Sequence, residues 1–198
     1  MTTYPIDERL FDELAVLSPP EVCNRAACRY DAIQNAYILS AWGDAYIITP
    51  SERRIECRPG GVTRPHPYFS VFLVHYLLKA RGIEPAEVWI SEKDVPGGQT
   101  FFRGPHEIPA YKISNRYKND INLYAERCAQ LGGRPLVMAD IAFAFQIMPQ
   151  ARVAVLYWLG DEDFPPEAKI LFDRSLAGYL AADVLFALAV DVCERLSG

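Results

Sequence analysis

The sequence predicts an α+β fold in which an antiparallel sheet, built from hairpins, packs against several helices. Two stretches, 30–49 and 139–159, are rich in β-branched and aromatic residues, and each contains a turn signal. Helical spacing of apolar residues recurs over 67–81, 110–131 and 176–196. Because 51% of the residues are hydrophobic, the chain can bury a sizeable core. We expect the hairpins to join into one sheet.

Size and composition favour a single domain over residues 1–198, since no Ser/Gly-rich linker or charge run divides the chain. The net charge of −5 argues against nucleic-acid binding, which needs basic groups to neutralise phosphate. The five cysteines are odd in number and widely spread, so they are not a disulfide framework. The apolar stretch 176–190 is too short to span a membrane and carries Asp183. With no signal sequence in view, we expect a cytoplasmic protein with reduced thiols and no membrane partner.

Two helices are expected at the start of the chain. Residues 6–17 show helical spacing with an acidic outer face. Ser18 then reads as an N-cap before prolines, so a short helix should follow to about Cys28. Cys23 and Cys28 are five residues apart, or roughly 140° around a helix. We therefore expect two separate core thiols rather than one metal site.

A three-stranded region is expected next. Residues 30–41 and 45–49 are rich in Tyr and Ile, with Trp42-Gly43-Asp44 between them, which is a hairpin signal. Residues 53–57 should add a third strand. The helix at 68–81 is apolar nearly all round and is expected to be the central, buried helix. His75 lies inside it, and the pattern favours a core histidine over a catalytic one.

The C-terminal part is expected to combine a hairpin with a long helix. Residues 136–147 and 152–159 read as strands, with 148–151 as the turn between them. In the first strand Ile141, Phe143, Phe145 and Ile147 alternate with small residues on the other face. The rest, 168–196, is expected to be helical with a break near 175–178.

The segment 92–106 is the candidate functional site, placed between a short strand at 88–90 and the helix at 110–131. Its glycines can turn backbone N–H groups towards an oxyanion, and its arginine can grip a carboxylate or phosphate bidentately. Two adjacent phenylalanines can stack on a flat ring. This chemistry predicts an anionic small molecule with an aromatic or conjugated part. The candidate ligand-binding residues are Lys93, Gly97, Gly98, Phe101, Phe102, Arg103 and His106.

Three other interpretations stay open at this point. The segment can be a tight turn anchored by two buried phenylalanines, with Arg103 bridging to Asp94 or to the acids at 161–163. It can belong to an enzyme that uses Arg103 and His106 with Asp161 or Asp163. The protein can also be a scaffold for a protein partner, without a small ligand. No nucleotide-binding or hydrolase motif is present, and the histidines lack metal-ligand spacing, so no metal or cofactor is assigned.

Four pieces of the chain together resemble an uncharacterised domain-of-unknown-function family found mainly in anaerobic bacteria and archaea. They are Leu77-Leu78-Lys79-Ala80-Arg81-Gly82, Pro96-Gly97-Gly98-Gln99-Thr100-Phe101-Phe102-Arg103-Gly104, Leu131-Gly132-Gly133, and Trp158-Leu159-Gly160-Asp161-Glu162-Asp163-Phe164-Pro165 leading to Leu171-Phe172-Asp173. Some family members are fused to an iron–sulfur domain like that of corrinoid proteins. The resemblance therefore implies a link to corrinoid or one-carbon metabolism, although this chain lacks the clustered cysteines of that domain. It carries over no catalytic residue.

Overall fold

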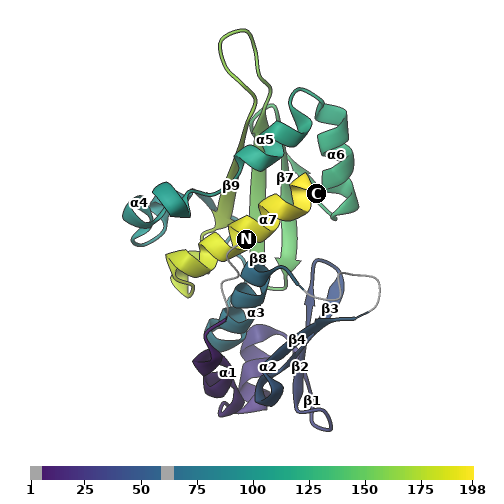
Figure 1. The fold of residues 1–198 in the computed structure, drawn as a ribbon, viewed down its shortest axis with the longest axis vertical. Coiled ribbons are helices and arrows are strands. Elements are labelled where there is room, and N and C mark those ends of the chain that lie inside the picture. Colours follow the sequence, from purple (N-terminus) through teal and green to yellow (C-terminus); the bar gives the residue numbers. More distant parts are fainter. Residues whose placement is uncertain (1–5, 59–64) are drawn as a thin grey trace.

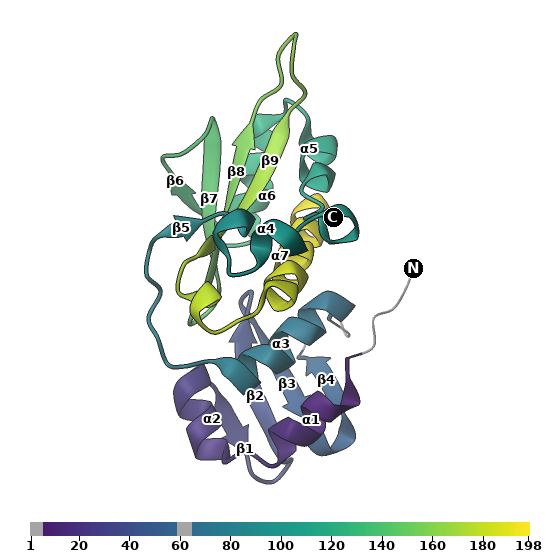
Figure 2. The same cartoon turned by 90° about the vertical axis from the view of Figure 1, so that its left-hand side faces the viewer.

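The computed structural model describes residues 6–58 and 65–198, and it forms an α+β fold with two antiparallel sheets (Figure 1). The expected fold class is confirmed. The expectation that the hairpins join into one sheet is wrong, because the four N-terminal strands and the five C-terminal strands form separate sheets. Each sheet has its own helices, and the two halves lie one above the other in Figures 1 and 2.

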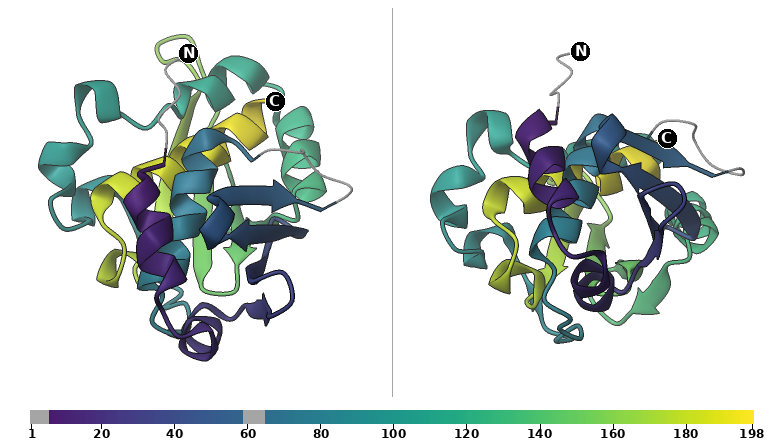
Figure 3. Two further views of the ribbon diagram at one scale, coloured as in Figure 1. Left: turned by 60° about the horizontal axis from the view of Figure 1, so that its bottom comes forward. Right: turned by 90° about the horizontal axis from the view of Figure 1, so that it is seen from below.

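The N-terminal half combines three helices with the sheet β1-β2-β3-β4. Its elements are α1 (Glu8–Ala15), α2 (Pro19–Ala26), β1 (Arg29–Asp31), β2 (Ala36–Ala41), β3 (Asp44–Thr49), β4 (Arg54–Cys57) and α3 (Pro67–Lys79). Trp42 and Gly43 join β2 to β3 with φ values of 52° and 83°, as a tight hairpin with two left-handed central residues requires. Figure 3 shows α1 and α3 packed side by side. Most of α3 is buried, as its apolar surface predicts.

The C-terminal half contains the sheet β5-β9-β8-β7-β6. Its strands are β5 (Trp89–Ile90), β6 (Arg134–Leu136), β7 (Ile141–Met148), β8 (Ala151–Trp158) and β9 (Glu167–Asp173). Its helices are α4 (Gly98–Phe101), α5 (Tyr111–Tyr117), α6 (Ile121–Gln130) and α7 (Ala182–Ser197). The side chains of β7 alternate as expected. Phe143, Phe145 and Ile147 enter the main core, and Ala142 joins a smaller apolar cluster on the opposite face.

Three boundaries in this half differ from the sequence predictions. The expected helix from 168 is wrong at its start, because Glu167–Asp173 is β9, paired with β8 and β5. The expected helix 110–131 is two helices. Lys118 adopts φ 50° and ψ −120°, and Asp120 then caps α6 by accepting the N–H of Leu123 at 3.0 Å. The expected strand 136–147 is divided into β6 and β7.

A largely buried polar cluster lies where the two halves meet, and we call it the junction cluster: Trp42, Tyr46, Asp191 and Arg195. Asp191 is 1% exposed and accepts hydrogen bonds from Trp42 Nε1 at 3.0 Å and Arg195 Nε at 2.8 Å. The same guanidinium donates to the Tyr46 hydroxyl at 3.0 Å and lies over the rings of Trp42 and Phe69. Burial raises the pKa of Asp191, and the donors from Arg195 and Trp42 oppose that rise. The cluster ties the β2–β3 turn to α7.

The C-terminal end of α2 corrects the expectation for Cys23 and Cys28. Ala27 is left-handed (φ 50°), and the N–H of Cys28 donates to the carbonyl of Cys23 at 3.1 Å, which closes a Schellman motif. The chain therefore leaves the helix before Cys28, and the two Sγ atoms lie 3.8 Å apart. The thiols are neighbours, whereas a continuous helix would have separated them.

Candidate functional site

The segment 92–106 is an ordered ridge rather than an open loop. A 3-10 turn over Glu92–Asp94 is capped by Ser91, whose hydroxyl donates to Asp94 at 2.7 Å. Helix α4 follows, and a second 3-10 turn covers Gly104–His106. In Figure 2 this segment lies at the front, across α7 and beside β9. Residues of this ridge line two clefts, one on each of its sides.

Gly97 and Gly98 shape the backbone of this ridge. Gly97 has φ +74°, a conformation that favours glycine. A Cβ on Gly98 would lie 1.9 Å from the carbonyl oxygen of Glu92, so no other residue fits without moving the backbone. The N–H of Gly98 donates to the Val95 carbonyl at 2.7 Å. That N–H is therefore committed to the turn, and the predicted oxyanion-binding role does not extend to it.

The two phenylalanines point to different neighbours. Phe102 packs against the main core, with its ring 6.5 Å from that of Phe172. Phe101 stacks on His106 with ring centroids 4.5 Å apart and an interplanar angle of 17°. Both of these rings make edge contacts with Phe186 of α7. One phenylalanine thus anchors the ridge, and the other extends an aromatic band towards α7.

The Arg103 cleft lies on one side of the ridge and has a volume of about 490 Å³. Three cations line it: Lys93 and Arg103 from the ridge and Lys169 from β9. Three carboxylates line it as well, Glu92, Glu107 and Glu167. The ring of Phe102 and the side chains of Ile108 and Ile170 supply apolar surface. Two of the predicted cations and one predicted ring therefore meet in one concave site.

The six charged side chains of the Arg103 cleft form no ion pair within 4.0 Å among the residues that the structure describes. The alternative in which Arg103 bridges to Asp94 or to 161–163 is wrong, because Asp94 is bonded to Ser91 and the acids at 161–163 line a separate pocket. Lys169 acts on Asp94 only at longer range. The guanidinium of Arg103 is therefore open to a partner from solution.

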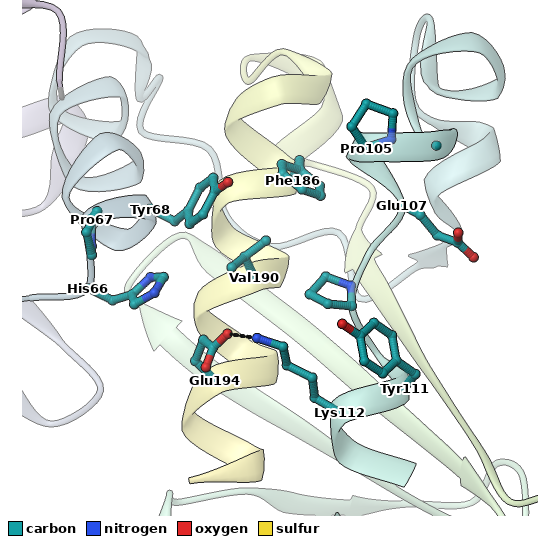
Figure 4. Close-up of a pocket in the computed structure, with 12 residues that line it drawn as sticks. His66, Pro67, Tyr68, Pro105, Glu107, Tyr111, Lys112, Phe186, Val190 and Glu194 are labelled. Carbon is teal, nitrogen blue, oxygen red and sulfur yellow. Dashed lines mark hydrogen bonds and ion pairs between the residues drawn. The ribbon is translucent and has the colours of Figure 1, made fainter. Parts of the chain in front are cut away.

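The Tyr68 cleft lies on the other side of the ridge and has a volume of about 460 Å³ (Figure 4). Its walls come from the start of α3, from α7 and from residues 104–112. Tyr68 makes an edge contact with Phe186 and is stacked on His66, with ring centroids 5.6 Å apart. An ion pair between Lys112 and Glu194 lies on its floor. Gly104 and Glu107 line both clefts, so one wall is shared.

The structure does not assemble the proposed acid–base set. Asp161 and Asp163 lie in the β8–β9 loop and line a separate surface pocket with Asn119 and Pro165. Asp161 accepts the N–H groups of Asp163 and Phe164, which lower its pKa. The segment that follows this loop is the strand β9, not the predicted helix. Over residues 6–58 and 65–198 no group of three His, Cys, Asp or Glu side chains could hold a metal ion.

Sequence reasoning missed residues that reach the clefts from distant elements. The sequence predicts a helix at Lys169, whereas its place beside Arg103 depends on the pairing of β9 with β5 and β8. Tyr68 and Phe186 lie in segments that the sequence predicts only as apolar helices. Ala168, Ile170 and Phe172 stand at every second position, as in a strand, but apolar Leu171 on the opposite face weakens this signal. His75 is half-buried, with burial lowering its pKa, and is not among the residues that line either cleft.

The fold and the clefts define a class: an α+β protein with two antiparallel sheets and two open clefts that share one ordered wall. Residues 18–195 match the model of a family described as a domain of unknown function (DUF3786), and the chain belongs to this family. The resemblance to a domain-of-unknown-function family is thereby confirmed. No curated protein and no solved structure matches the chain. None of the helices in the described residues has the length and apolar character needed to cross a membrane.

Proposed function

We propose that this protein binds a small anionic molecule in the Arg103 cleft, as a binding or accessory protein. The observation that carries the proposal is the unpaired guanidinium of Arg103 beside the ring of Phe102. A planar guanidinium recognises a carboxylate or phosphate through two parallel hydrogen bonds. Lys93 and Lys169 add positive charge, and the ring offers a face for stacking.

The three carboxylates of the cleft restrict the charge of this ligand. Glu92, Glu107 and Glu167 balance the three cations, so the cleft as a whole carries no net charge. A polyphosphate would meet these carboxylates as well as the cations. The cleft therefore favours a ligand with one anionic group, and with donors such as amino, amide or hydroxyl groups for the carboxylates. The apolar surface of Phe102, Ile108 and Ile170 favours a ligand with a conjugated or aromatic body.

The test is thermal unfolding in the presence of candidate anions. The panel contains inorganic phosphate, aromatic carboxylates, nucleotides, folates, flavins and corrinoids, the last because the family resemblance implies a corrinoid or one-carbon link. A compound at about 100 times its dissociation constant stabilises the folded state by about 2.7 kcal/mol. Such a shift in Tm is measurable, and titration calorimetry then gives the affinity.

Arg103→Ala is the deciding variant. Loss of charged hydrogen bonds of about 1.5–3 kcal/mol should weaken binding of the hit by about 10- to 150-fold. Arg134→Ala is the matched control, because Arg134 is exposed and lines a pocket away from the ridge. Equal affinity in the native protein and in Arg103→Ala would contradict the proposal. A panel without any hit would favour the alternative of a protein partner.

A further inference from the structure

We propose that Cys23 and Cys28 form a reversible dithiol site that closes to a disulfide when the protein meets a disulfide oxidant. This goes beyond the proposed ligand site and does not depend on it. The two Sγ atoms lie 3.8 Å apart, and both residues are half-buried. A disulfide needs an S–S separation of about 2.05 Å, so rotation of the two side chains towards each other must close the gap.

The Schellman motif is what brings the thiols together. Cys23 and Cys28 occupy the two positions of this motif whose side chains often make an apolar contact. Any pair of apolar residues would serve that contact. Two thiols add chemistry that such a pair lacks, and the left-handed Ala27 holds them on the same side of the turn.

The other cysteines show how specific this arrangement is. Cys57 is also half-buried, but its thiol lies beside the Arg58 carbonyl, at 3.8 Å, and the Tyr46 side chain rather than another thiol. Cys128 and Cys193 are buried singly in the main core. Within the described residues, no other pair of cysteine sulfurs makes a contact like that of Cys23 with Cys28. The chain therefore contains its own controls for thiol reactivity.

The closing reaction balances with oxidised glutathione as the oxidant. One cysteine thiolate attacks a glutathione sulfur, forms a mixed disulfide and releases one reduced glutathione. The second cysteine thiolate attacks the sulfur of its neighbour, forms the protein disulfide and releases a second reduced glutathione. Two thiol protons transfer to the two glutathione thiolates. Burial raises the pKa of Cys28 to about 12, so closing is slow near neutral pH and faster at higher pH.

A disulfide between Cys23 and Cys28 would stabilise a contact between the two halves. The carbonyl of Arg25 accepts the N–H of Gly82 at 2.9 Å and the side chain of Gln150 at 2.9 Å. The carbonyl of Ala26 accepts the hydroxyl of Tyr76 at 3.1 Å. A disulfide across this turn would fix the geometry of both carbonyls.

The test treats the folded, reduced, full-length protein with mixtures of reduced and oxidised glutathione at pH 8.5. Free thiols are then blocked with N-ethylmaleimide, and the protein is digested with trypsin. Trypsin cleaves after Arg9, Arg25 and Arg29, so the two cysteines end on separate peptides, 10–25 and 26–29. We expect mass spectrometry to detect these peptides joined by a disulfide, and Cys57 to carry glutathione or N-ethylmaleimide alone.

The single variants complete the test. In Cys23→Ser and Cys28→Ser the remaining thiol should accumulate as a glutathione mixed disulfide, because no neighbour resolves it. Cys57→Ser should close as the native protein does. The proposal is overturned if native protein collects glutathione on both Cys23 and Cys28 without the joined peptides. It is also overturned if both thiols stay free while Cys57 is oxidised.

Discussion

The junction cluster and the Arg103 cleft place charges beside aromatic rings in opposite ways. At the junction, Asp191 and Arg195 are paired with each other and with Trp42 and Tyr46, and are largely shielded from water. In the cleft, six charged groups line an open surface without ion pairs among the described residues. Arg103 lies in solvent, next to a ring. Charges that satisfy one another hold a fold together, whereas charges left open are available to a ligand.

The largest expected effect is at the junction. Asp191→Ala removes the buried member of an ion pair and leaves the partly buried Arg195 guanidinium without its carboxylate. Breaking such a pair costs about 3–5 kcal/mol. We expect a loss of this size in the free energy of unfolding, measured by urea titration with the change in m-value recorded alongside.

A double variant separates the charge from the packing. Asp191→Leu with Arg195→Met replaces both charged groups by apolar ones, which can be nearly neutral when the shape is kept. The double variant should therefore be more stable than Asp191→Ala. Native stability in Asp191→Ala would show that the cluster contributes nothing, and the contrast with the cleft would fail.

The two phenylalanines of the ridge give the next largest difference. Changing a fully buried phenylalanine to alanine lowers the free energy of unfolding by about 3–5 kcal/mol. Phe102 is only half-buried, so Phe102→Ala should lower it by about 2 kcal/mol. Phe101→Ala loses mainly ring contacts, each worth about 0.5–1.5 kcal/mol. Thermal unfolding should place Phe102→Ala below Phe101→Ala. The reverse order would mean that Phe101 is the anchor.

Asp173 provides a test at low pH. This carboxylate is 0% exposed and accepts the N–H groups of Ala86, Glu87 and Ser175 at 2.7–2.9 Å. Burial alone would raise its pKa, but hydrogen bonds outweigh burial and hold the pKa below its ordinary value.

Because the pKa of Asp173 is lower in the folded than in the unfolded state, its contribution is present above the unfolded value, near pH 4. That contribution is lost as the pH falls through the folded pKa. Asp173→Asn should cost about 1–3 kcal/mol at pH 7 and should show a smaller loss of stability between pH 5 and pH 2. Parallel curves of Tm against pH for the two proteins would contradict this assignment.

The smallest expected effect on stability belongs to Arg103. Its side chain is exposed and makes no ion pair within the described residues, so Arg103→Ala should change the free energy of unfolding by less than about 0.5 kcal/mol. Urea titration checks this value. A large loss would mean that Arg103 is a structural residue, and the proposed ligand site would lose its main support.

The sequence was most informative where burial follows a simple period or where a turn has strict backbone demands. The β2–β3 turn is an example, because Gly43 can take the positive φ that its position requires. The buried α3 is another, because its surface is apolar on nearly all sides. In β9, however, Ile170 and Phe172 enter the main core while Leu171 joins the cluster on the opposite face. Because both faces are apolar, the sequence shows no clean period of two and predicts a helix where the structure has a strand.

The sequence predicts the candidate site only in part, because local chemistry can be read from the sequence and tertiary contacts cannot. Local chemistry identified Arg103 and Phe102, which do line a common cleft. It could not show that Gly98 is fixed by the nearby Glu92 carbonyl, because that contact depends on a 3-10 turn. Nor could it bring in Lys169, whose position is set by strand pairing between distant segments.

The junction cluster also gives the molecule an internal optical reporter. The indole of Trp42 lies between the Arg195 guanidinium, the Asp191 carboxylate and the Phe145 ring. The other two tryptophans, Trp89 and Trp158, lie on the outer face of the second sheet. With those two replaced by phenylalanine, the emission of Trp42 would report on a single boundary. Any separation of the two halves would then change the wavelength and intensity of the Trp42 fluorescence emission.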